Sequence, residues 1–197
     1  MATGAGKRAD WVRNRERLVE AAGDLVARDG VSISLEEVAR RAGVGSATLH
    51  RHFPSREVLL IAVFDDGVQR VVALGREYCR SLGGEAFAAW LEELTVFTAS
   101  SRGLALSLRR GEVRDNCYAS LREVAEQLGA SAVAEGRLRP DIGISDLLAL
   151  VNGLAIQAEG EPDSARRLIR IALSGVASEV VAPNEPRRSD VKCDAPS

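Results

Sequence analysis

The side chains best suited to molecular recognition gather in one short segment, GSATLHRHF, which ends at Phe53. Its threonine offers a hydroxyl and a methyl group, while its arginine and histidines can donate hydrogen bonds to guanine edges or phosphate oxygens. Leu49 and Phe53 lie four residues apart, so on a helix they share one face that can pack inward. We therefore predict a short helix that leaves its small and hydrogen-bonding residues largely outside: Ser46, Ala47, Thr48, Arg51 and His52.

Metal binding and catalysis are the competing uses of such residues. The two histidines of the chain, His50 and His52, are two positions apart, and such residues do not face the same way on a helix. Because no histidine follows His52, a Glu-x-x-His di-iron site or a histidine-based triad in the rest of the chain is excluded. No P-loop or GxGxxG phosphate cradle occurs either. We expect no metal, no cofactor and no catalytic residue, with a helical-bundle enzyme carrying a DNA-binding domain as an alternative.

Helix signals on both sides of this segment indicate how it is positioned. In the motif SLEE, Ser34 and Glu37 have the spacing of a capping box, in which the serine accepts from the helix N-terminus and the glutamate reaches back. We expect four successive helices: residues 10–29 ending before Gly30, a helix capped by Ser34 and ending at Gly43, residues 46–52 ending at Phe53-Pro54, and a long helix capped by Ser55. Two short helices around a glycine-containing turn form a helix-turn-helix, whose second helix lies in the major groove of DNA.

Residues 13–64, above all SLEEVARRAGVGSATLHRHFPSREVLL, resemble the N-terminal domain of the tetracycline-repressor (TetR) family. The resemblance rests on the capping serine, Ala39, Gly43-Val44, Thr48-Leu49, His52-Phe53 and Ser55-Arg56-Glu57, all at the spacing of the family. It implies that Ser46, Ala47 and Thr48 meet the bases or the adjacent backbone, and that His50, His52 and Arg56 hold phosphates. The chain departs from the family at two positions: His50 stands where tyrosine is usual, and Gly45 where serine or threonine is frequent.

Charge and cysteine content agree with a cytoplasmic DNA-binding protein. The net charge of the 197 residues is −2, yet the first sixty residues carry ten basic and eight acidic side chains. Cys79, Cys117 and Cys193 lie far apart and form no CxxC pair, which favours a reduced, cytoplasmic environment. No apolar signal segment or membrane span is apparent, so we expect no membrane partner. A redox-responsive regulator that uses Cys117 remains an alternative, although Cys117 shares an apolar stripe with Leu121.

The remainder of the chain predicts an all-α protein of about nine helices. Apolar residues recur every three or four positions, strong helix formers dominate, and no proline lies between Pro54 and Pro140. We predict a DNA-binding domain over residues 10–56 and an effector-binding and dimerisation domain over residues 57–182. Residues 1–9 and 183–197, which lack apolar periodicity, are predicted to be flexible tails.

The resemblance also implies a homodimer and a small-molecule effector among the later helices. The helices near residues 144–156 and 168–176 are apolar on more than one side, since Leu150, Ile156 and Ile171 lie off their main stripes, which predicts dimerisation through the last two helices. Repression from a near-palindromic operator, relieved by a mostly apolar effector, is the mode that the family implies. The candidate wall of the effector pocket consists of Phe87, Trp90, Leu94, Tyr118 and Leu121.

Overall fold

The computed structural model describes residues 3–107, 115–158 and 160–176. In these ranges it contains eight α-helices, one short 3-10 helix and no strand, which confirms the predicted all-α class with one helix fewer than expected. The elements are α1 (Thr3–Asp29), α2 (Leu35–Ala42), α3 (Ser46–His52), α4 (Arg56–Ser81), η1 (Gly83–Glu85), α5 (Ala86–Ser107), α6 (Asp115–Ala134), α7 (Ile144–Gln157) and α8 (Pro162–Val176).

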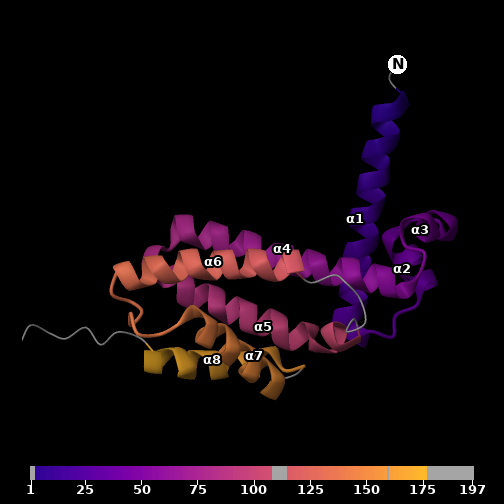
Figure 1. The fold of residues 1–197 in the computed structure, drawn as a ribbon. Helices are drawn as coiled ribbons and strands as arrows, with labels where there is room; N and C mark the ends of the chain where they lie inside the picture. The colour runs from indigo at the N-terminus through magenta and orange to yellow at the C-terminus, as the bar shows by residue number, and fades with distance from the viewer. Residues whose placement is uncertain (1–2, 108–114, 159, 177–197) are drawn as a thin grey trace, which may run out of the picture.

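The first three helices pack into a small unit at one end of the molecule (Figure 1). Its core is formed by residues that recur on one face of each helix, including Leu18, Leu25, Val38 and Leu49, all of which are buried. Both turns of this unit use glycine in the left-handed region, with φ of 77° at Gly30 and 63° at Gly43. Residues that carry a side chain rarely adopt this backbone conformation. Glycine therefore determines where α1 and α2 end, as the sequence predicted.

Serine residues cap the N-termini of α2 and α4. The Ser34 hydroxyl oxygen accepts a hydrogen bond from the Glu37 backbone N–H at 3.4 Å, and Ser55 accepts one from the Val58 N–H at 3.4 Å. The expected return contact of the capping box is replaced by an ion pair, because the Glu37 carboxylate binds the Arg40 guanidinium at 2.6 and 2.8 Å. The capping-box prediction for α2 is therefore half right.

The first helix is longer than the sequence predicted. It begins at Thr3 and not near Asp10, so most of the segment assigned to an N-terminal tail is helical. Helix propagation adds a hydrogen bond with each residue fixed and needs no tertiary contact, which explains why residues without apolar periodicity extend a helix that is anchored at Leu18. Figure 1 shows this part of α1 standing out from the body of the molecule. The predicted tail at 183–197 lies outside the described residues.

The long helix α4 leads from the N-terminal unit into a bundle with α5–α8 (Figure 1). α5 is central to the bundle and packs against α4, α7 and α8. The indole N–H of Trp90 donates a hydrogen bond to the carbonyl of Val71 on α4 at 2.9 Å. A Cβ atom at Gly75 would lie 2.7 Å from Nε1 of that indole, so glycine permits this close helix crossing. α4 therefore extends from the N-terminal unit and packs closely against α5 in the bundle.

Candidate nucleic-acid interface

Helix α3 separates its residues into a buried side and a solvent side. Leu49 and the following Phe53 are each 1% exposed, which confirms their predicted core positions. Thr48 is half-buried. Four residues of the helix are exposed: Ser46, Ala47, His50 and Arg51. The small residues stand at the N-terminal end of α3, where a helix axis can come close to another surface.

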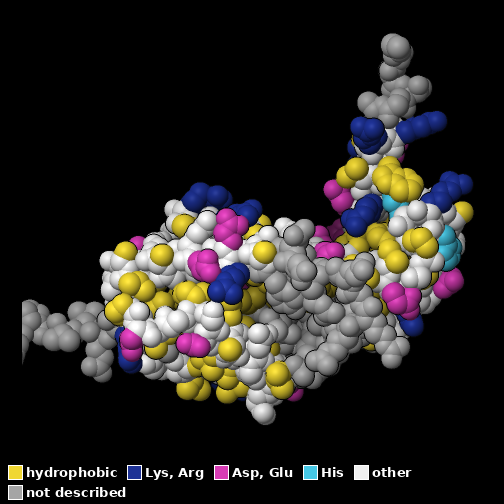
Figure 2. Space-filling model, in the orientation of Figure 1, with side chains coloured by type: hydrophobic (Ala, Val, Ile, Leu, Met, Phe, Trp, Pro, Cys, Tyr) yellow, Lys and Arg dark blue, Asp and Glu magenta, His cyan; other side chains and the backbone are white. Residues whose placement is uncertain are grey.

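The arginines around α3 differ in whether their charge is neutralised. Arg51 and the exposed Arg56 form no ion pair within the described part of the chain. By contrast, Arg40 pairs with Glu37 at 2.6 Å, and Arg41 lies 3.6 Å from Asp24. The guanidinium groups of Arg51 and Arg56 are thus available to bind an anionic partner. Figure 2 shows Lys and Arg side chains on the surface of the end of the molecule that α1–α3 form.

The two histidines of α3 have different environments. His50 is exposed, and a hydrogen bond from the Ser34 hydroxyl lowers the pKa of the nearby Glu36 carboxyl. The ring of His52 lies against the Trp11 indole of α1 with 3.6 Å between ring centroids, and both of its nitrogens are buried without a hydrogen-bond partner among the described residues. Burial, and then the charge of Arg15, lower the pKa of His52. The expectation that His52 lies outside is therefore wrong.

Sequence reasoning missed Trp11, which covers His52. Residues 10–29 were predicted as a helix, and Trp11 lies seven positions before the buried Leu18, on the side of α1 that continues the core stripe. This spacing is the signal that could have placed an aromatic ring over the end of α3. The spacing did not predict the contact because the partner of Trp11 is a histidine, and histidine on a surface helix is usually exposed to solvent.

Four of the five residues of the predicted effector wall lie in the packed core. Phe87, Trp90, Leu94 and Leu121 are all buried in the main hydrophobic cluster, whereas the side chain of Tyr118 falls outside the described residues. The physical reason is that an apolar stripe first serves to pack its helix against neighbours, and α5 has neighbours on several sides. None of the four buried residues lines the groove described next.

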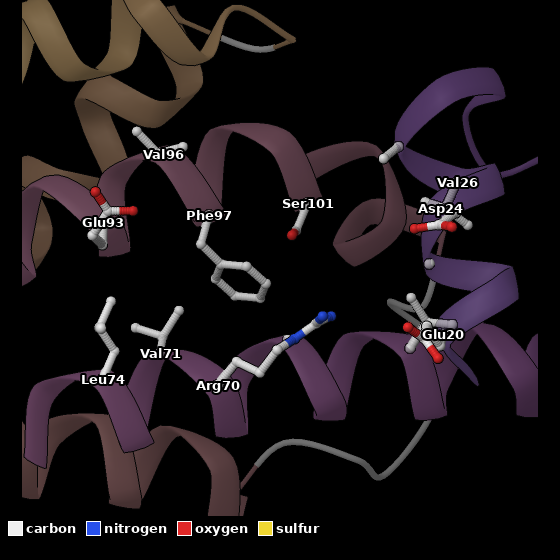
Figure 3. Close-up of a pocket in the computed structure, with 14 residues that line it drawn as sticks. Glu20, Asp24, Val26, Arg70, Val71, Leu74, Glu93, Val96, Phe97 and Ser101 are labelled. Atoms are coloured by element: carbon white, nitrogen blue, oxygen red, sulfur yellow. The ribbon is translucent and has the colours of Figure 1, made fainter. Parts of the chain in front are cut away.

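A groove with a volume of about 620 Å³ lies where α1, α4 and α5 meet (Figure 3). One wall belongs to the N-terminal unit and the other to the bundle, with α4 as the floor. Figure 3 shows the Phe97 ring of α5 and the Arg70 side chain of α4 directed into the space between these two helices, with α1 at its end. The lining combines apolar and charged side chains, including Val26, Val71, Leu74, Val96 and Phe97 together with Glu20, Asp24, Arg70 and Glu93.

Other kinds of site find less support in the described residues. Among them no group of three or more histidine, cysteine or acidic side chains could hold a metal ion. None of the helices searched is long and apolar enough to cross a membrane. Cys79 is an exposed free thiol on α4, whereas the side chain of Cys117 and all of Cys193 lie outside the described residues. The structure therefore leaves the redox alternative at Cys117 untested.

Comparisons with known proteins agree with this architecture. Residues 18–63 match the family model described as bacterial regulatory proteins, tetR family, and residues 83–178 match the SbtR-like transcriptional regulator C-terminal domain. The regulator BetI of Rhizobium meliloti is 33% identical over 62% of this chain and 71% of its own length.

Solved structures of two TetR regulators are also similar. The one from Mycobacterium vanbaalenii is 31% identical, with a TM-score of 0.71 over 86% of this chain and 98% of that protein. The one from Streptomyces coelicolor is 29% identical, with a TM-score of 0.72 over 84% and 99%. Matches that cover both the helix-turn-helix and the bundle establish more than a shared motif. The chain belongs to the TetR family of transcriptional regulators, which implies binding to operator DNA and dimerisation.

Proposed function

We propose that this protein is a repressor that inserts α3 into the major groove of its operator. The observation that carries this proposal is the exposed side of α3, where small side chains precede two arginines that have no ion pair in the described structure. Ser46, Ala47 and Thr48 would approach the bases, and His50, Arg51 and Arg56 would bind the phosphates. Such a protein acts in the cytoplasm, where bacterial DNA resides.

Repression is tested with a reporter gene behind the promoter nearest to the regulator's own binding site. Expression should rise when the regulator gene is deleted and fall again when the wild-type gene is restored. Restoring Arg56→Ala should leave expression high, because a phosphate contact is lost. Expression that falls on deletion would show activation, and would contradict the proposed repression while leaving DNA binding intact.

The proposed dimer forms through α7 and α8. Ile156 on α7 and Ile171 on α8 are 52% and 68% exposed, which is unusual for large aliphatic side chains on the last two helices of a packed bundle. Burial of both in a two-fold interface would remove this apolar surface from water. Two copies of α3 would then read two half-sites on the same DNA.

Sedimentation velocity tests this interface at micromolar protein concentration. Ile171→Glu should shift the protein toward monomer and reduce operator affinity, since each copy of α3 would then bind alone. Val133→Glu is the matched control, because Val133 on α6 is also an exposed aliphatic residue but lies outside the proposed interface. An Ile171→Glu protein that remains dimeric would rule out an interface centred on α8.

We place the effector in the groove between α1, α4 and α5. Its two walls belong to the parts of the molecule that would move relative to each other, so a ligand bound there contacts both. The lining favours a molecule that combines an apolar body with a charged or polar group, since Phe97 and Leu74 lie beside Glu20 and Arg70. This differs from the mostly apolar effector that the sequence predicted.

A screen by thermal shift, followed by titration of each hit with and without operator, tests the effector proposal. A true effector must bind more weakly to the DNA complex by the same factor with which it weakens DNA binding, typically about 5- to 150-fold. Ala27→Phe, which fills the groove, should abolish the response, whereas Ala134→Phe on α6 should retain it. Hits with equal affinity in both titrations would refute induction through this groove.

A further inference from the structure

The C-terminal end of α3 packs against α1 through two adjacent ring contacts. His52, the last residue of α3, lies against the Trp11 indole with 3.6 Å between centroids and 34° between planes. The next residue, Phe53, has the Arg15 guanidinium 5.5 Å above its ring centroid. Trp11 and Arg15 are one helical turn apart, so one face of α1 holds two consecutive residues at the end of α3.

The beginning of α3 shows no comparable ring contact within the described residues. Its N-cap is Gly45, which makes no side-chain capping hydrogen bond. A serine or threonine at this position would accept a hydrogen bond from the first turn of the helix. The inward side of α3 therefore depends on Leu49 and Phe53, and on the contact between His52 and Trp11, to fix the angle at which the helix leaves the unit.

We propose that His52 is a positioning residue, not a phosphate ligand: its ring packs beneath Trp11 and sets the orientation of α3 relative to α1. The inference rests on the proposed DNA binding by α3 and assigns a different role to one of its residues. Both imidazole nitrogens are covered, so His52 can reach a phosphate only if the Trp11 indole leaves the contact. Arg51 and Arg56 need no such rearrangement, because both are already exposed.

The electrostatic environment supports the same assignment. Burial and the neighbouring Arg15 lower the pKa of His52, so the neutral form predominates near neutral pH. A neutral imidazole lacks the positive charge that makes arginine effective at phosphate. Its two unsatisfied nitrogens also cost free energy, which an apolar ring of similar shape would avoid. The hydrogen-bonding atoms of His52 are therefore dispensable, whereas its ring is not.

The decisive experiment compares ring-retaining and ring-deleting variants of the full chain. The proteins are His52→Phe, His52→Ala, Trp11→Phe, Trp11→Ala and the double alanine variant, each titrated at several salt concentrations with the duplex that the wild type selects most strongly. We expect both phenylalanine variants to bind within about threefold of the wild type. Each alanine variant should lose roughly tenfold in affinity, and the double variant should lose little more, because the two residues act through one contact.

The salt dependence distinguishes positioning from phosphate binding. All five variants should keep the wild-type slope of log affinity against log salt, because no phosphate contact is removed. His50→Ala and His50→Phe are the matched controls: His50 is exposed, and neither variant should show coupling to Trp11→Ala. Equal loss of affinity in His52→Phe and His52→Ala would overturn the proposal, and a slope reduced by about one in both would identify a phosphate ligand.

A second measurement separates failure of this inference from failure of DNA binding itself. The free energy of unfolding of the same five variants, measured without DNA, should show coupling between Trp11→Ala and His52→Ala, and His52→Phe should be at least as stable as the wild type. If the wild type selects no duplex, the proposed function fails. Additive effects of the two alanine substitutions on stability would instead show that the Trp11–His52 contact does not hold α3 against α1.

Discussion

The N-terminal unit and the helical bundle use their large side chains in different ways. In the unit of α1–α3, the exposed surface of α3 includes Arg51, which forms no ion pair in the described part of the chain, and the exposed Trp11 covers His52. In the bundle of α4–α8, the aromatic and aliphatic residues that seemed suited to a ligand, such as Trp90 and Phe87, are packed into the core. Substitutions should therefore change recognition in the first region and stability in the second.

The largest expected effect is on stability, at Trp90. Trp90 is fully buried and its indole donates a hydrogen bond to Val71, so Trp90→Ala should lower the free energy of unfolding by about 3–5 kcal/mol. Urea denaturation at fixed protein concentration measures this loss. Trp11→Ala is the comparison, because Trp11 is half exposed and should cost much less. A Trp90→Ala protein of unchanged stability but altered ligand response would show that Trp90 lines a pocket after all.

The next effect is on DNA binding, at Arg56. Arg56→Ala should weaken binding to all duplexes alike by roughly tenfold and reduce the slope of log affinity against log salt by about one, because one phosphate contact is lost. Its free energy of unfolding should stay within about 0.5 kcal/mol of the wild type. Arg40→Ala is the matched control, since Arg40 is exposed but paired with Glu37. Equal losses in both variants would show that general charge, not position, governs affinity.

The sequence predicted the local features of the N-terminal unit but not the contacts between its helices. Local signals placed the helix ends, because Gly30 and Gly43 need a left-handed conformation and Ser55 caps the helix that follows it. The sides of α3 followed from the spacing of Leu49 and Phe53. The environment of His52 did not, because it depends on a residue of another helix forty-one positions earlier.

The prediction of an effector pocket shows the same limit. An apolar stripe has the same sequence pattern whether it packs against a neighbouring helix or lines a cavity. The spacing of Phe87, Trp90 and Leu94 therefore could not distinguish core residues from a pocket wall, and the structure buries all three. The groove is formed instead by residues from three helices, such as Glu20, Arg70 and Phe97, that share no sequence pattern. Tertiary packing decides which spaces remain open.

A smaller effect is expected at the start of α4, which joins the two regions. Ser55→Ala removes the acceptor for the Val58 N–H and should cost about 0.5–1 kcal/mol of stability, toward the lower end for caps because the hydrogen bond is 3.4 Å long. Thermal or urea unfolding measures this difference. Ser81→Ala at the other end of the same helix removes no N-terminal cap and should change stability less. A greater loss for Ser81→Ala would contradict the role of Ser55.

The smallest effect is the pH dependence of stability at His52. Because its pKa in the folded protein is lowered, by burial first and then by Arg15, the unfolded chain takes up the proton first as pH falls below the ordinary histidine value of about 6.5. Stability should therefore decrease on acidification through that range. His52→Phe should remove this component, whereas His50→Phe should retain it. A wild-type and a His52→Phe profile of identical shape would show that the imidazole is not buried in solution.

The central claim, that α3 reads DNA in a dimer, is tested most directly by selection of genomic duplexes at low salt. The wild type should enrich a near-palindromic sequence whose half-sites lie roughly 34–36 Å apart or a multiple of that distance. Thr48→Val, which keeps a methyl group but loses the hydroxyl, should enrich an altered sequence while keeping much of its non-specific affinity. Failure of the wild type to enrich any duplex, or an enriched sequence that is unchanged by substitutions at Ser46, Ala47 and Thr48 alike, would contradict the account.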